Sequence, residues 1–301
     1  MRKAVISLLL VSAVITGCGS AQHTPQSSAS PSAGGARQLT DAEELRISDA
    51  QQRLIGTCMR RQGFKYWEAE RLSLEESRTL GYVLDDVGWA RKHGYGSRIE
   101  AKETAARASN PNLAYRKSLS EQRRQSYDEA LDEGIDAPVI AVEIPGGGTL
   151  RKRMGGCVAE SEKKLYGDPR AWFRAEKAVG HLRSLYVPRV LADQRFSAAQ
   201  NAWSRCMKRA GYAYKDPGAS RQSAVAQASR SAEPKAFEAE RKLAVADATC
   251  ARDTDLRPIG EERESHYVAQ LRERYGEALD THSRLQHQAL DRAKKIVGPR
   301  A

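Results

Sequence analysis

The sequence predicts a mainly α-helical fold in which disulfide bonds hold the helices together. Charged residues make up 29% of the chain and aromatic residues only 6%, a composition typical of helical soluble proteins. A nine-residue pattern, CMRRQGFKY at residues 58–66, returns as CMKRAGYAY at residues 206–214. We therefore expect a disulfide-stapled helical bundle of two related halves, with a long C-terminal helix and at most a small β-hairpin.

The repeated pattern has a local explanation, because a glycine just past a helix commonly takes the left-handed conformation that closes a Schellman cap. Such caps bring together the side chains at C3 and C″, here Met59 and Phe64. A shift of 148 residues (206 − 58) aligns residues 50–67 with 198–215, and seven of the 18 aligned positions are identical. These matches favour an internal duplication, with chance as the alternative over so short a stretch.

The N-terminal region predicts export. Arg2 and Lys3 precede an apolar run of signal-peptide length at residues 4–15, which is too short to span a bilayer. The run ends in Ile15-Thr16-Gly17-Cys18, which resembles a lipobox, the motif at which lipoprotein signal peptidases leave a lipidated cysteine. An ordinary secretory signal with an incidental cysteine is the alternative.

The lipobox predicts both the division of the chain into segments and its cellular location. We expect a lipoprotein signal peptide at residues 1–17, a flexible Ser-, Ala- and Pro-rich tether at 18–38 and a helical body at 39–301, with halves of about 39–167 and 168–301. Acyl chains such as palmitate on Cys18 then hold the protein on the outer face of the cell membrane.

The charge of the mature chain indicates which partners are compatible. Without Arg2 and Lys3, 47 basic residues (49 − 2) face 38 acidic ones, a net charge of +9. An exported protein does not meet nucleic acid routinely. The excess therefore favours the anionic membrane surface or an anionic wall polymer as partner, and an envelope protein is a further possible partner. The alternative is that the arginines are simply solvated on helix surfaces.

Local signals place the helices in order. Thr40 and Glu43 form a capping box, Asp168-Pro169 supplies an N-cap and an N1 proline, and Asp193 caps a later helix. Pro188 is expected to interrupt or kink its helix. The stretch 64–112 is irregular and predicts short helices and ordered loops. The remaining expected elements are helices at 118–134, 156–167, 234–250 and 261–297, a strand at 139–144 leading into a hairpin, and a mobile connection at 216–233.

Four cysteines remain after lipidation, in an oxidising compartment where an even number usually forms disulfides. Three pairings are available. Each copy of the repeated pattern is followed by one further cysteine, which selects Cys58 with Cys157 and Cys206 with Cys250. No two cysteines stand two to four residues apart, so we expect no metal site.

Catalytic signatures are absent from the sequence. None of the six histidines belongs to an H-E-x-x-H motif, and no G-x-S-x-G elbow occurs. We expect a binding or structural protein without a cofactor; the alternative is an envelope hydrolase with no recognisable motif. A ligand pocket is expected where aromatic residues stand among glycines, with a plug at the open end of the bundle as the alternative. Its expected lining is Trp67, Tyr82, Trp89 and Tyr95.

Besides the lipobox and the repeated pattern, several short motifs are spread over the mature chain. They are Asn110-Pro111-Asn112 with Tyr115, Tyr127-Asp128-Glu129-Ala130-Leu131, Gly155-Gly156-Cys157 with Leu165-Tyr166-Gly167, Trp203 with Cys206-Met207 and Gly211-Tyr212, and Leu243-Ala244-Val245-Ala246-Asp247 with Cys250. Taken together, these motifs resemble those of uncharacterised actinobacterial-type extracytoplasmic lipoproteins with duplicated Cys-Met-x-x-x-Gly-aromatic motifs. The resemblance implies an envelope location and no assigned activity.

Overall fold

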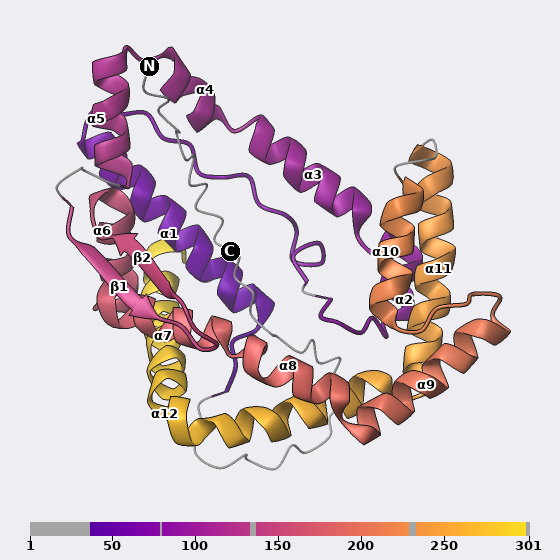
Figure 1. Cartoon of the computed structure of the whole chain (residues 1–301). Coiled ribbons are helices and arrows are strands. Elements are labelled where there is room, and N and C mark those ends of the chain that lie inside the picture. The colour runs from indigo at the N-terminus through magenta and orange to yellow at the C-terminus, as the bar shows by residue number, and fades with distance from the viewer. Residues whose placement is uncertain (1–36, 79, 133–136, 229–232, 299–301) are drawn as a thin grey trace, which may run out of the picture.

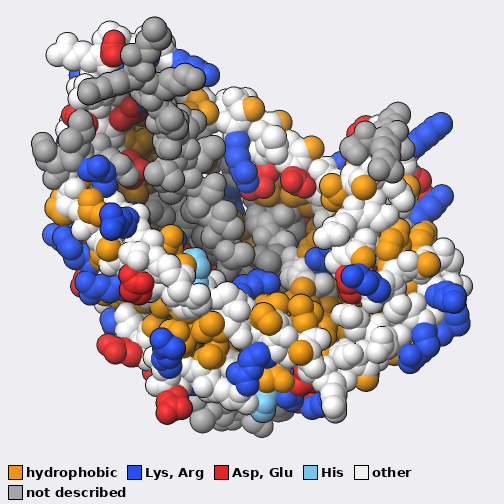
Figure 2. All heavy atoms as spheres, in the orientation of Figure 1, with side chains coloured by type: hydrophobic (Ala, Val, Ile, Leu, Met, Phe, Trp, Pro, Cys, Tyr) orange, Lys and Arg blue, Asp and Glu red, His pale blue; other side chains and the backbone are white. Residues whose placement is uncertain are grey.

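The computed structural model describes residues 37–78, 80–132, 137–228 and 233–298. The expected signal peptide, the lipidated Cys18 and most of the tether lie outside these residues. Figure 1 shows the helices in an open, curved arrangement, and Figure 2 shows both basic and acidic side chains on the face in view. The helices α1, α5, α6 and α7 lie on one side with the hairpin, and α2, α9, α10 and α11 lie on the other. Among the described residues, no helix has the length and apolar character needed to cross a membrane.

The expectation of a mainly helical fold with a long C-terminal helix and a small hairpin is confirmed. The elements are α1 Asp41–Arg61, α2 Val87–His93, α3 Ser97–Ala108, α4 Pro111–Ser118, α5 Glu121–Leu131, β1 Val139–Glu143, β2 Thr149–Arg153, α6 Gly156–Tyr166, α7 Pro169–His181, α8 Arg183–Ala192, α9 Gln194–Arg209, α10 Pro217–Ala228, α11 Glu233–Asp253 and α12 Leu256–Val297. The strands pair antiparallel, with Ile140 and Val142 buried against Phe173.

Helix α1 begins and ends as its sequence predicts. The Thr40 hydroxyl accepts from the Glu43 N–H, and the Glu43 carboxylate accepts from the Thr40 N–H in return. At the other end Gly63 has φ +79°, the Phe64 N–H donates to the Met59 carbonyl at 3.0 Å, and the Gly63 N–H donates to the Arg60 carbonyl. These two bonds define a Schellman cap.

Helix α9 ends in the same way. Gly211 has φ +89°, and the Tyr212 N–H donates to the Met207 carbonyl at 2.8 Å. Met207 is fully buried, and Tyr212 packs against the same core cluster. The repeated sequence pattern therefore specifies one backbone structure in both places, and its glycine and aromatic residues are explained by helix termination.

Both expected disulfides are present. Cys58–Cys157 joins the end of α1 to the start of α6, with the Cα atoms 5.5 Å apart. Cys206–Cys250 joins the last turns of α9 and α11, with the Cα atoms 5.6 Å apart. Each bridge therefore ties one copy of the repeated motif to a helix from further along the chain.

Helix α12 connects the two sides of the molecule. It packs against α1, α6 and α7 and also against α8 and α9, and it curves between the two sides (Figure 1). Its 42 residues correspond to about 63 Å at about 1.5 Å per residue. It begins five residues before the expected start because Pro258 falls in the first turn, where proline costs no helical hydrogen bond.

The region of α10 differs from its sequence expectation, and the region of α8 agrees with it only in part. The stretch expected as a mobile connection contains α10, which starts where the Asp216 Oδ1 accepts from the Ala219 N–H at 2.7 Å, and Ser220 and Ala224 are buried. Pro188, which was expected to interrupt or kink its helix, lies inside α8 and does not interrupt it. The break between α7 and α8 falls at Leu182 instead, whose buried side chain belongs to the main core cluster.

Candidate functional site

The structure places the four expected pocket residues in different surroundings. Trp89 is buried and Tyr95 packs against the same cluster, while Tyr82 packs edge-on against Phe196 at 5.9 Å. Trp67 is 40% exposed and follows the end of α1, which Figure 1 shows across the molecule from α2. The structure therefore brings Trp89 and Tyr95 together, whereas Trp67 belongs to a separate surface.

Tyr95, which lies between α2 and α3, belongs to a buried polar centre around Asp247 of α11. Its hydroxyl donates to the Asp247 Oδ2 at 2.9 Å, the Ser220 hydroxyl donates to the same oxygen at 3.1 Å, and the Trp203 Nε1–H donates to Oδ1 at 2.9 Å. Asp247 and Ser220 are completely buried. Burial raises the pKa of Asp247 above its usual range.

Glu240, two turns before Asp247, fixes the turn that precedes α3. Its carboxylate accepts from the Tyr95 N–H at 2.7 Å, from the Ser97 N–H at 3.2 Å and from the Ser97 hydroxyl. Gly94 has φ +64°, and a Cβ there would lie 2.7 Å from the Glu240 Oε1. The backbone must therefore approach this carboxylate without a side chain between them.

Sequence reasoning missed this centre, although a signal was present. Glu240 and Asp247 are seven residues apart and so lie on one face of α11. That face otherwise carries apolar residues, and a carboxylate on such a face needs buried donors. Because Asp247 and Ser220 are fully buried, a substrate would reach them only if α10 and α11 separated. The described residues also contain no group of His, Cys, Asp and Glu side chains that could hold a metal ion.

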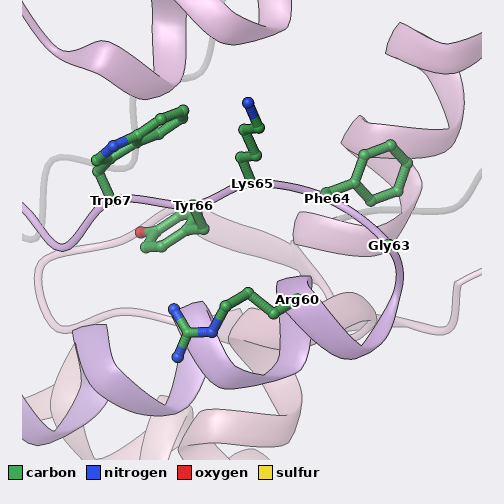
Figure 3. Close-up of a pocket in the computed structure, with 6 residues that line it drawn as sticks. All are labelled: Arg60, Gly63, Phe64, Lys65, Tyr66 and Trp67. Atoms are coloured by element: carbon green, nitrogen blue, oxygen red, sulfur yellow. The ribbon is translucent and has the colours of Figure 1, made fainter.

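A second arrangement, which we call the Trp67 surface, lies beside the end of α1. It is a shallow pocket with a volume of about 420 Å³. Figure 3 shows Lys65 and Trp67 on one side of the extended segment, with Tyr66 and Arg60 on the side that faces α1. The pocket is lined by Arg60, Gly63, Phe64, Lys65, Tyr66 and Trp67.

Trp67 is held in place despite its exposure. The Asn112 side chain accepts from the Trp67 N–H at 3.0 Å and donates to the Trp67 carbonyl at 2.8 Å, as a neighbouring strand would. The indole also packs edge-on against Tyr115, with ring centroids 5.7 Å apart. The exposed ring is therefore preorganised, with little side-chain entropy left to lose on binding.

Tyr66 and Arg60 share the space above Gly56, in the middle of α1. A Cβ at Gly56 would lie 3.3 Å from the Tyr66 ring and 3.2 Å from an Arg60 guanidinium nitrogen. The Tyr66 hydroxyl donates to the Gln52 side-chain oxygen at 3.0 Å. A glycine inside a helix costs about 1 kcal/mol relative to alanine, and here it gives the segment 64–67 room to lie close to α1.

The charges of the Trp67 surface are mostly unneutralised. Within the described part of the chain, Arg60, Lys65 and Arg123 form no ion pair: Arg60 bonds the Thr57 hydroxyl, and the Arg123 guanidinium lies 4.3 Å from the centroid of the Phe64 ring. The next carboxylate along the segment, Glu68, is itself paired with a basic side chain of α1. Phe64 is buried and anchors the segment in the core.

A further hollow, of about 490 Å³, lies over the first disulfide. Cys58 and Cys157 line it together with Glu160, whose Oε2 lies 3.3 Å from the Cys58 Sγ. Arg61 and Lys164 bond the Glu160 carboxylate and lower its pKa, Lys164 contributing more. The charge of Glu160 in this hollow is therefore already neutralised.

A scan against protein-family models and searches of curated proteins and of solved structures each gave no match.

Proposed function

We propose that the protein is a membrane-anchored, extracytoplasmic binding protein of the cell envelope, and that the Trp67 surface is its binding site. The observation that carries this proposal is the exposed Trp67, which Asn112 fixes in place beside Lys65. A large aromatic side chain that is both exposed and held rigid is typical of a recognition site.

The proposed location follows from two features. The two disulfides suit an oxidising compartment outside the cytoplasm. The lipobox-like sequence ending at Cys18 supplies the lipid anchor of this proposal. We also propose that the two motif copies arose by duplication, so that residues 39–167 and 168–301 are related halves of which the first acquired the site.

The buried Asp247 centre offers no support for the rival hydrolase. Its carboxylate is already occupied by three side-chain donors and has no exposed surface. Such a network stabilises the packing of α10 and α11. A binding role at the Trp67 surface, which is exposed without any rearrangement, is the better supported of the two.

Co-sedimentation of the mature chain with isolated cell-envelope fragments tests the proposal. Trp67→Ala should lower the bound fraction several-fold while leaving the circular dichroism spectrum unchanged. Leu191→Ala on α8 is the matched control, because Leu191 is an equally conspicuous exposed apolar residue. Equal retention of wild type and Trp67→Ala would count against this binding site.

A further inference from the structure

We propose that the ligand of the Trp67 surface is an anionic wall polymer, a chain of sugar or polyol units that carries regularly spaced phosphodiester or carboxylate groups. The inference rests on the proposed binding function and names the chemical class of its ligand.

The first argument is the charge of the surface. Arg60, Lys65 and Arg123 meet around one helix end, and in the described chain none of them has a carboxylate partner. A group of cations without carboxylate partners attracts a ligand that carries several anionic groups.

The second argument is the alternation of charge and ring. Lys65 and Trp67 project from the same side of the extended segment, and the Trp67 ring is fixed. A polymer with anionic links between carbon-rich units would place an anionic group against the ammonium and a C–H-rich face against the indole. An amphipathic aromatic ring accepts such a face without demanding one particular sugar.

The third argument is the shape of the site. Small-molecule sites usually bury most of the ligand surface. The Trp67 surface is shallow, and the basic side chains continue past its edge to Arg123, which donates to the Gly63 carbonyl at 3.2 Å. An extended ligand that runs across the surface fits this geometry better than a ligand that must be enclosed.

The fourth argument is position. The 21 residues of α1 separate the point where the tether enters the body from the Trp67 surface, which corresponds to about 30 Å at about 1.5 Å per residue. The site therefore lies at the end of α1 that is remote from the anchored end. With the tether end of the body turned toward the membrane, that placement favours a polymer of the wall over lipid headgroups.

The second motif copy provides a matched control within the same chain. Lys208 occupies the position of Arg60, but Ala213 and Lys215 stand where the first copy has Lys65 and Trp67. Lys208 is exposed, so reversing its charge changes the net charge of the protein as Arg60→Glu does without altering the Trp67 surface.

Titration of the full mature chain with defined polymers tests the inference. The probes are poly(glycerol phosphate), neutral dextran, poly-L-glutamate and vesicles that contain phosphatidylglycerol. We expect poly(glycerol phosphate) to bind with an affinity that falls steeply with salt. Arg60→Glu and Lys65→Glu should each weaken it about tenfold or more and Trp67→Ala several-fold, with Lys208→Glu changing it less than about twofold.

The outcomes separate the inference from the function on which it rests. If Lys208→Glu weakens binding as much as Arg60→Glu, the attraction is general and the inference fails. Equal affinity for dextran, poly-L-glutamate or vesicles would replace the ligand class with a neutral glycan, an acidic peptide or a lipid surface. If no defined polymer binds but envelope fragments still retain wild type and not Trp67→Ala, the ligand class is wrong and the binding function stands. If the fragments do not distinguish these two proteins, both proposals fail.

Discussion

The two copies of the Cys-Met-x-x-x-Gly-aromatic motif share a backbone but differ in what surrounds it. Both end a helix in a Schellman cap and both carry a disulfide. In the first copy Gly56 leaves room for Tyr66 and Arg60, whereas Ser204 at the corresponding position donates to the Tyr214 carbonyl at 2.6 Å. The motif itself is therefore structural, and its neighbours decide whether the following segment presents a site.

The polar groups beside the two disulfides also differ between the copies, in their exposure and in their charged partners. Glu160, next to Cys58, is partly exposed and paired with Arg61 and Lys164. Asp247, one turn before Cys250, is fully buried and bonded only by uncharged donors. The first copy is thus joined by its disulfide to a solvent-exposed, charged surface, while the second copy is joined by its disulfide to the buried core.

Removing the disulfides has the largest expected effect. Cys58–Cys157 spans 99 residues and Cys206–Cys250 spans 44. On the chain-entropy estimate, paired serine variants should lose about 4.7 and about 4 kcal/mol of unfolding free energy, because the longer loop restricts the unfolded chain more. Urea unfolding followed by circular dichroism measures both. A larger loss for the second pair would show that packing around α9 and α11, not loop length, sets the ranking.

Two buried tyrosines test the difference in polar surroundings. Tyr95→Phe removes a bonded hydroxyl and leaves Asp247 with one donor fewer, so it should cost about 1–2 kcal/mol. Tyr127→Phe, in the core of the first copy, should be neutral or slightly stabilising, because the Tyr127 hydroxyl is buried with no hydrogen-bond partner in the described chain. Thermal unfolding of both variants measures the contrast, and equal losses would contradict it.

The carboxylates beside the two disulfides should change stability with pH in opposite directions. Burial raises the pKa of Asp247, so the contribution of Asp247 to the free energy of unfolding falls as the pH rises above the unfolded value of about 4. The stability of Asp247→Asn should therefore increase relative to that of wild type as the pH rises above about 4. Lys164 and Arg61 lower the pKa of Glu160. The contribution of Glu160 to the free energy of unfolding is therefore lost as the pH falls below about 4.3, the unfolded value. In that range the stability of wild type should approach that of Glu160→Gln.

Melting temperatures of wild type, Asp247→Asn and Glu160→Gln, measured over the acid and neutral range, give the difference between wild type and each variant at each pH. A gap between wild type and Asp247→Asn that stays constant with pH would mean that the Asp247 carboxylate does not titrate differently in the folded protein. The Glu160 variant serves as the internal comparison, because its change is confined to the acid range.

The parts of the fold that the sequence predicted are those with local chemistry. The capping box at Thr40, the glycine at position 63 and the pairing of Cys58 with Cys157 each follow from a few adjacent residues or from the repeat. The stretch 217–228 was not predicted as a helix, because its small polar residues are equally typical of a linker. Its burial depends on Ser220 meeting Asp247, a contact across 27 residues that no local pattern contains.

The candidate site was predicted in part for the same reason. Trp67 was singled out by its place in an irregular aromatic stretch, but its separation from Trp89 and Tyr95 depends on the path of the chain between α1 and α2. The role of Asn112, which bonds the Trp67 backbone from 45 residues away, also required the tertiary structure.

The two capping glycines give the smallest expected effect and the most direct test of the shared backbone. Gly63 and Gly211 both have positive φ, and an added Cβ would meet nothing within 4 Å at either position. An alanine at either position therefore lowers the free energy of unfolding only through the strain of the left-handed conformation, by about 1 kcal/mol in each copy. Urea unfolding of Gly63→Ala and Gly211→Ala should give losses equal to within about 0.5 kcal/mol, because both alanines would adopt the same left-handed conformation and meet no neighbouring atom. A clearly larger loss at Gly63 would mean that the segment leading to Trp67 moves when the cap is strained, and the cap would then belong to the site as well as to the helix.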